Sequence, residues 1–282
     1  MRKIAHLSDL HFGRVDEALL APLRACLTRL RPDVLVVSGD LTQRARAQQF
    51  RQARAFLGTL PGPQIIVPGN HDVPLHDVFS RFLAPLRNYR RFITHDLEPA
   101  LIDREIAVVG VNTARSFTFK GGRINHEQVE RVRAILCELP RSLMKIVVTH
   151  HPFDMPAHWR DDQIVGRAPM AMRMFARCEA DILLAGHLHM SHAGASTARY
   201  SMKGYAALVV QAGTATSTRA RGEMNSFNML SIEGSAVRVD RYTWQPGARE
   251  FALAHSEGFE RTAQGWAESA ARIDRPAPPG VV

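Results

Sequence analysis

The sequence has few cysteines and no long apolar run. Three of its 282 residues are cysteines, and their odd number and spacing match no zinc ribbon or CxxC motif. No apolar stretch reaches the roughly 18 residues that a membrane-spanning helix needs, and the apolar run at Ile4–Leu7 is too short for a signal peptide. We therefore expect a cytoplasmic protein with three buried, reduced thiols at Cys26, Cys137 and Cys178.

Lysine is also scarce, since it supplies only four of the 36 basic residues. The formal net charge of +9 is therefore carried almost entirely by arginine. The guanidinium group binds oxyanions through paired hydrogen bonds, which suits a phosphate-bearing ligand. Nucleic acid or an anionic membrane surface would also be attracted. Because the arginines are spread along the chain, a general compositional bias explains them equally well.

The chain lacks an internal linker and an internal repeat. Its hydrophobic content of 45% is sufficient for an ordinary globular core. We expect residues 1–255 to form one domain. Residues 256–282 are expected to form a C-terminal segment, and the last of these residues, rich in proline, are expected to be disordered.

Short apolar runs alternate with helical patterns, which favours an α/β fold. Expected strands cover 3–8, 33–38, 64–68, 106–111, 145–149, 181–185, 207–211, 227–232 and 236–243. Expected helices cover 16–30, 46–57, 75–86, 125–139 and 170–177. The first strands are nearly continuous in Val, Ile and Leu, as in parallel strands buried on both faces. The helix-free region after His189 predicts a second, more antiparallel sheet.

Five blocks of metal-binding side chains follow these strands. They are Asp9-Leu10-His11, Gly39-Asp40, Gly69-Asn70-His71-Asp72, His150-His151 and Gly186-His187-Leu188-His189. In open α/β sheets ligands bind beyond the carboxyl ends of the strands, and residues i and i+2 of an extended segment point the same way. Taken alone, most blocks are explained by turns and helix caps at least as well as by metal binding. Together they predict a site for two cations.

With these motifs the chain resembles the calcineurin-like metallophosphoesterases over roughly residues 3–235. The resemblance implies a four-layer α/β/β/α sandwich of two mixed β-sheets flanked by helices. It also implies that Asp9, His11, Asp40 and His189 hold one ion, and that Asp40, Asn70, His150 and His187 hold the other. His71, with Asn70, is then assigned to catalysis. Within the superfamily the chain looks most like the bacterial branch of class III cyclic-nucleotide phosphodiesterases and glycerophosphodiesterases.

This resemblance predicts a phosphodiesterase acting on small phosphodiesters such as 3',5'-cyclic nucleotides. Two metal ions can clamp a phosphodiester and hold a bridging hydroxide as the nucleophile. Oxygen and imidazole ligands favour Mn, Fe or Zn. Candidate substrate-binding residues are His151, Arg115, Arg219 and Arg221. The segment 153–168, which contains Trp159, is expected to form a loop over the site.

Three alternatives compete with this interpretation. A nuclease fits the basic charge, although the sequence has no aromatic-studded basic stripe. A nucleotide-sugar-lipid pyrophosphohydrolase is disfavoured, because the enzyme of this type that acts on UDP-diacylglucosamine has Arg in place of His71. A non-catalytic scaffold is expected to lose ligands, and all are present here. The sequence does not determine the oligomeric state, and a homodimer is one of the possibilities.

Overall fold

The computed structural model describes residues 1–118, 120–155, 163–196, 198–200, 202, 204–219 and 222–269. The described helices are α1 (Glu17–Leu30), α2 (Ala47–Leu57), α3 (Val78–Leu83), α4 (Arg87–Phe92), α5 (His126–Leu136) and α6 (Ala168–Cys178). Helix α1 begins as the sequence predicts, because the Asp16 side chain caps it by accepting from the Ala18 amide. The expected helix over 75–86 is shorter, and α4 follows it as a separate element.

The strands form two mixed sheets. The first sheet has the order β13 (Gly265–Glu268), β12 (Glu250–Thr262), β11 (Ala236–Gln245), β10 (Ser226–Glu233), β1 (Arg2–Leu7), β2 (Val34–Val37), β3 (Gln64–Ile66). The second has the order β4 (Ala100–Ile102), β5 (Ile106–Gly110), β6 (Met144–Val148), β7 (Ile182–Ala185), β9 (Leu208–Gln211), β8 (His192–Ala195). Strands β1 to β3 are parallel, and so are β5, β6, β7 and β9.

The chain forms two sheets, but the expectation that the region after His189 makes up the second, more antiparallel one is wrong. Strands β10 to β13 are antiparallel, but β10 pairs with β1 and so extends the first sheet. Strand β12 also runs through residue 255, the expected end of the domain, without a break. Residues up to Glu268 therefore belong to the first sheet. The proline-rich end lies outside the described residues.

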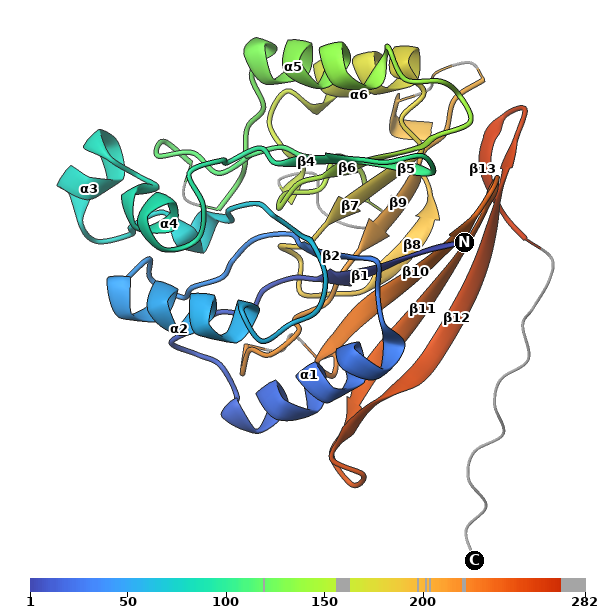
Figure 1. Cartoon of the computed structure of the whole chain (residues 1–282). Helices are drawn as coiled ribbons and strands as arrows, with labels where there is room; N and C mark the ends of the chain where they lie inside the picture. Colours follow the sequence, from blue (N-terminus) through green and yellow to red (C-terminus); the bar gives the residue numbers. More distant parts are fainter. Residues whose placement is uncertain are drawn as a thin grey trace, which may run out of the picture.

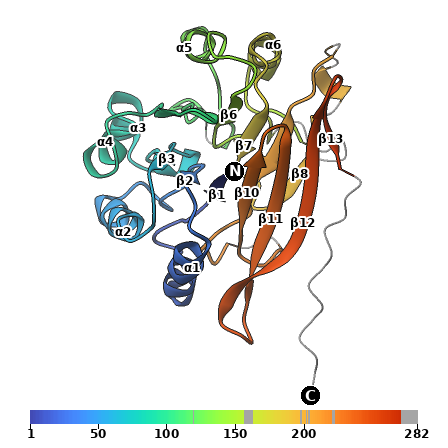
Figure 2. The ribbon, with the colours of Figure 1, turned by 45° about the vertical axis from the view of Figure 1, so that its right-hand side comes forward.

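The two sheets stack face to face between two layers of helices, as the sequence predicts (Figure 1). Helices α1 and α2 cover the first sheet, and α5 and α6 cover the second (Figures 1 and 2). Leu27 and Phe50 belong to a core under α1 and α2, and Val132 and Phe175 to a core under α5 and α6. A third core fills the space between the sheets. Each buried Leu or Phe stabilises the fold by roughly 1.5–3 kcal/mol, so all three interfaces are strong.

A disulfide between Cys137 and Cys178 joins the ends of α5 and α6. The prediction of three reduced thiols is therefore wrong for these two residues, and only Cys26 is a buried free thiol. The disulfide also removes the thiol argument for the cytosol, where such bonds are rare. Within the described part of the chain, no helix is long and apolar enough to cross a membrane.

Reduction of this disulfide is expected to lower the free energy of unfolding. The bond closes a segment with a sequence separation of 41, and chain entropy predicts a loss of about 4 kcal/mol when it opens. Urea unfolding with and without dithiothreitol measures the loss, and a Cys137→Ala/Cys178→Ala variant should not respond to the reductant. Titration of three thiols in the unfolded, unreduced protein would contradict the pairing.

Candidate metal centre

Loops after five parallel strands converge at one end of the sandwich. Asp9 and His11 follow β1, Asp40 follows β2, and Asn70 lies in the short 3-10 turn after β3. His150 follows β6, and His187 and His189 follow β7. Because these strands are parallel within each sheet, their carboxyl ends meet at a common edge. The structure therefore brings together all seven residues that were predicted to bind metal.

The first group consists of Asp9, His11 and His189. Asp9 Oδ1 lies 3.4 Å from His11 Nε2 and 3.2 Å from His189 Nε2. The two imidazole Nε2 atoms are 3.4 Å apart. All three side chains are buried, and their ligand atoms lie within 4.8 Å of one another. One cation could contact all three.

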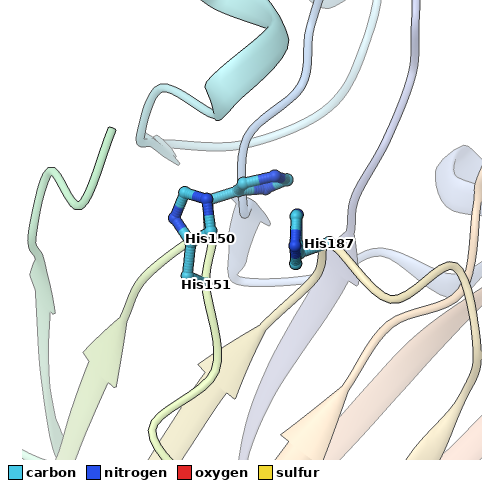
Figure 3. A group of neighbouring side chains, drawn as sticks. All are labelled: His150, His151 and His187. Atoms are coloured by element: carbon cyan, nitrogen blue, oxygen red, sulfur yellow. The ribbon is translucent and has the colours of Figure 1, made fainter. Parts of the chain in front are cut away.

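The second group is centred on Asn70. Its Oδ1 lies 3.0 Å from His150 Nε2 and 3.2 Å from His187 Nδ1. Figure 3 shows the imidazoles of His150, His151 and His187 grouped on the loops that follow β6 and β7. An amide oxygen cannot be protonated at ordinary pH, so it contributes a neutral ligand beside two imidazoles. This group could hold a second cation.

Asp40 lies between the two groups. Its Oδ2 is 3.4 Å from His150 Nε2 and 3.7 Å from His11 Nε2, so one carboxylate oxygen reaches both. Burial alone would raise the pKa of Asp40, but the charge and hydrogen bond of His150 outweigh burial and hold that pKa well below its usual value. Burial likewise opposes protonation of His150, yet Asp40 raises the pKa of His150 to about 9. A cation would take the place of this proton.

The ligands are held in an unusual backbone conformation. Positive φ angles between 51° and 72° occur at the non-glycine ligands Asp9, His11, Asp40, His187 and His189. The expectation that Asp9-Leu10-His11 and His187-Leu188-His189 are extended is therefore wrong, and the paired side chains meet through left-handed turns instead. Such conformations cost of order 1–3 kcal/mol each and gather at functional sites.

Two glycines of the motifs are required for close approach. A Cβ on Gly69 would lie 2.1 Å from Asp40 Oδ1, and a Cβ on Gly186 would lie 1.8 Å from Ser8 Oγ. Gly69 has φ −105°, a backbone conformation that other residues also adopt. Its role is to let the loop after β3 touch Asp40.

Groups other than the metal ligands orient the ligands. The Ser38 carbonyl accepts from His150 Nδ1 at 2.7 Å, which leaves Nε2 facing the site. Asp72 accepts from the amides of Gly69, Leu41 and Thr42, and so ties the loops after β2 and β3 together. The contact with Ser38 could not be predicted from the sequence, because any residue type can supply a backbone carbonyl.

His71 lies beside Asp40 and Arg219. Its amide donates to Asp40 Oδ1 at 2.8 Å, and its Nδ1 lies 3.0 Å from the carbonyl of Gln43. Arg219 Nη1 lies 2.9 Å from His71 Nε2. Since a guanidinium only donates, Nε2 accepts and Nδ1 carries the proton. Burial, aided by His11 and Arg219, lowers the pKa of His71 despite the opposing charge of Asp40.

The other predicted substrate-binding residues behave differently. His151 is fully buried beside His150 and His187, with Nδ1 2.8 Å from Thr113 Oγ1 and Nε2 3.1 Å from the Lys120 carbonyl. Arg115 donates to Gln128 and to backbone carbonyls of its own loop, outside both metal groups. Arg221 and Trp159 lie outside the described residues.

The donor set fits two divalent cations. Asp9 Oδ1 and His187 Nε2 are buried atoms without a hydrogen-bond partner in the described part of the chain. An unsatisfied buried carboxylate oxygen is costly unless a cation or donor meets it. Oxygen and imidazole ligands without thiolate suit Mn, Fe or Zn.

Acid is expected to destabilise the fold through His6, which is buried beneath the site. Burial lowers the pKa of His6 to about 3, and its Nε2 lies 2.9 Å from Ser38 Oγ. The folded protein keeps His6 neutral, whereas the unfolded chain binds a proton below about pH 6.5. The stability from this group is therefore complete above pH 6.5 and falls by about 1.4 kcal/mol per pH unit toward pH 3.

Urea unfolding of the chelator-treated protein at several pH values measures this loss. His6→Asn should give a shallower dependence of stability on pH than the wild type. The other buried histidines are present in both proteins, so their contributions to the pH dependence of stability cancel when the two slopes are compared. Equal slopes would contradict a neutral, buried His6.

A scan of family models matches residues 2–191 to the calcineurin-like phosphoesterase family. This match covers more than half of the chain, and the chain belongs to that family of phosphoester hydrolases. Among curated relatives, the 3',5'-cyclic adenosine monophosphate phosphodiesterase CpdA of Escherichia coli is 24% identical over 203 residues, 66% of this chain and 69% of CpdA. The glycerophosphodiester phosphodiesterase GpdQ of Enterobacter lignolyticus is 36% identical over 94 residues, 29% of this chain. That match spans only 33% of GpdQ.

Solved structures share the fold at low sequence identity. The purple acid phosphatase PPD1 of yellow lupin superposes with a TM-score of 0.66 and 12% identity, over 90% of this chain and 53% of the phosphatase. A dimetal phosphatase from Danio rerio superposes with a TM-score of 0.63 and 12% identity, over 89% of this chain and 98% of its own. These likenesses confirm the predicted four-layer fold.

Proposed function

We propose that the protein is a two-metal phosphodiesterase that acts on small phosphodiesters, 3',5'-cyclic nucleotides among them. The position of Asp40 is the observation that carries the proposal, because one buried carboxylate reaches both metal groups. In the proposed site Asp9, His11, Asp40 and His189 hold one ion. Asp40, Asn70, His150 and His187 hold the other. The names of the relatives CpdA and GpdQ favour diesters over monoesters.

Two bound ions would supply positive charge at the phosphoryl group and activate the attacking water. Residues of the chain would bind the phosphate and supply a proton to the leaving group. Arg219 is always charged, and its guanidinium beside His71 would attract a phosphate oxygen. His71 Nε2, which accepts from Arg219 in the structure, would act as the proton donor only after the ring takes up a second proton there from solvent; that proton would pass to the departing alkoxide oxygen. His71 and Arg219 together therefore form the leaving-group side of the proposed site.

The proposal is tested by hydrolysis of a substrate panel after reconstitution with Mn²⁺. The panel contains bis-p-nitrophenyl phosphate, cyclic AMP, glycerophosphocholine, a UDP-linked lipid and a DNA duplex, with p-nitrophenyl phosphate as the monoester. We expect the diesters to be cleaved faster than the monoester, and EDTA to abolish the activity. Inactivity on every diester would leave a non-catalytic scaffold, and a preference for the monoester would also contradict the proposal.

A further inference from the structure

An apolar patch projects from α3 and from the loop after β5. It consists of Val78, Phe79, Phe82 and Leu83 on α3 and Phe117 on the loop, which we name the α3 patch. Phe79 and Leu83 are 81% exposed and Phe117 is 86% exposed. The rings of Phe82 and Phe117 lie 5.1 Å apart, so the two segments form one surface. Helix α3 lies at the periphery of the molecule in both views (Figures 1 and 2).

Hydrogen bonds of a buried arginine hold this patch in its exposed position. Arg81 points inward from α3 and is only 2% exposed. Its guanidinium donates to the carbonyls of Ser116 at 2.7 Å, Pro74 at 2.8 Å and Thr118 at 2.9 Å. Helix α3 is thereby fixed to the Phe117 loop, and the opposite face of the helix is turned outward. The exposed apolar side chains are therefore a formed surface, and large surfaces of this kind mark interaction sites.

Both segments that form the α3 patch, helix α3 and the loop that carries Phe117, are connected to the metal centre. The turn that contains Asn70 and His71 precedes α3 in the chain. The loop that carries Phe117 also supplies the Lys120 carbonyl, 3.1 Å from His151 Nε2 beside the second metal group. A ligand that covers this patch would thus lie at the same end of the molecule as the proposed catalytic site.

Arginines border the α3 patch. A cavity of about 790 Å³ adjoins the patch, since Leu83 and Ser116 are among its lining residues. It is also lined by four arginines, Arg87, Arg90, Arg91 and Arg115. The first three are exposed on the surface of α4. A second cavity, of about 250 Å³, reaches Ser80 of α3 and is lined by Arg44, Arg46 and Arg87. This second lining also contains Asp77, whose carboxylate is engaged in capping α3. Protruding apolar side chains thus sit inside a cationic border.

We propose that the α3 patch docks the protein onto a bilayer that contains anionic lipids. Phe79, Leu83 and Phe117 enter the boundary between headgroups and acyl chains, and the arginines of α4 contact lipid phosphates. Charge decides between a bilayer and a second copy of the chain. A two-fold contact through this patch would bring two identical arginine borders together, whereas an anionic bilayer neutralises them. The net charge of +9 acts in the same direction.

Flotation with lipid vesicles tests the proposal. The probes are vesicles of phosphatidylcholine alone and of equal parts phosphatidylglycerol and phosphatidylcholine. We expect the full-length protein to float with the anionic vesicles and to be released by high salt. Phe79→Ser/Leu83→Ser should weaken binding by about a hundredfold, roughly tenfold per side chain. Arg90→Gln/Arg91→Gln should weaken it by roughly fivefold per arginine.

Two matched controls accompany these variants. Ile102→Ser changes an exposed apolar residue of β4, and Arg173→Gln/Arg177→Gln changes exposed arginines of α6. Both should float like the wild type. Thermal unfolding checks that every variant is folded. Absence of wild-type binding to anionic vesicles overturns the proposal, and so does equal loss in the control variants. A dimer in sedimentation velocity that Phe79→Ser/Leu83→Ser makes monomeric would instead assign the patch to a second copy.

Discussion

Replacement of Asp40 by asparagine is expected to remove both metal ions and the activity with them. The carboxylate lies between His150 and His11, and its pKa is held well below the usual value, so it is charged at every working pH. Asparagine has nearly the same shape but only one neutral oxygen, so it cannot join two cations. We expect kcat to fall by at least about 10³-fold, because several kcal/mol of charge stabilisation are lost.

Metal analysis of the purified variant measures this outcome directly. Wild-type protein dialysed against Mn²⁺ should retain two ions per chain, and Asp40→Asn should retain fewer than one. Asp96→Asn is the matched control, since Asp96 is exposed and its carboxylate accepts from the Glu98 amide of the same loop. Two tightly held ions in Asp40→Asn would show that Asp40 does not bridge them.

Replacement of His71 by alanine is expected to reduce turnover while both ions remain bound. His71 contacts Asp40 through its backbone amide, which alanine keeps. Its ring is hydrogen-bonded to Arg219 and the Gln43 carbonyl. Loss of a general acid costs about 10²–10⁴-fold. The cost should depend on the leaving group, because p-nitrophenolate departs without a proton and the alkoxide of a cyclic nucleotide does not.

Parallel kinetics on cyclic AMP and bis-p-nitrophenyl phosphate separate these cases. We expect His71→Ala to lose about 10³-fold on the alkoxide substrate and only about tenfold on the p-nitrophenyl diester. His76→Ala, an exposed neighbour, is the control and should match the wild type on both. Equal losses on the two substrates would remove the proton-donor role and leave His71 with a positioning role.

The central strands were predictable from the sequence, whereas four outer strands, β4, β8, β12 and β13, were not. Strands β2 and β7 are fully buried and appear as continuous apolar runs, and β1 and β6 are mostly buried and largely apolar. Strand β12 is largely exposed, and its sequence from Glu250 to Thr262 has no such run. A strand of this kind is determined by its neighbours in the sheet rather than by its own residues.

Helix α4 and the disulfide were also missed, for different reasons. Three of the six residues of α4 are arginine, and the helix is anchored by Tyr89, whose hydroxyl donates to the Ile66 carbonyl at 2.9 Å. That contact is tertiary and leaves no periodic pattern. The pairing of Cys137 with Cys178 depends on how α5 packs beside α6, and spacing alone cannot predict it.

The candidate metal ligands could be predicted because each follows a buried strand at the same edge of its sheet. Their orientation could not be predicted. His150 and His151 are adjacent in sequence, yet one turns its Nε2 to Asp40 and the other is buried against Thr113 and Lys120. The contact between Arg219 and His71 joins residues 148 positions apart, so only the folded chain reveals it.

Crystals soaked in manganese test the two-ion site most directly. The account predicts two anomalous scattering peaks roughly 3.5–4 Å apart, with Asp40 between them. Asp9, His11 and His189 should surround one peak, and Asn70, His150 and His187 should surround the other. A single peak, or two peaks that do not share Asp40, would contradict the account.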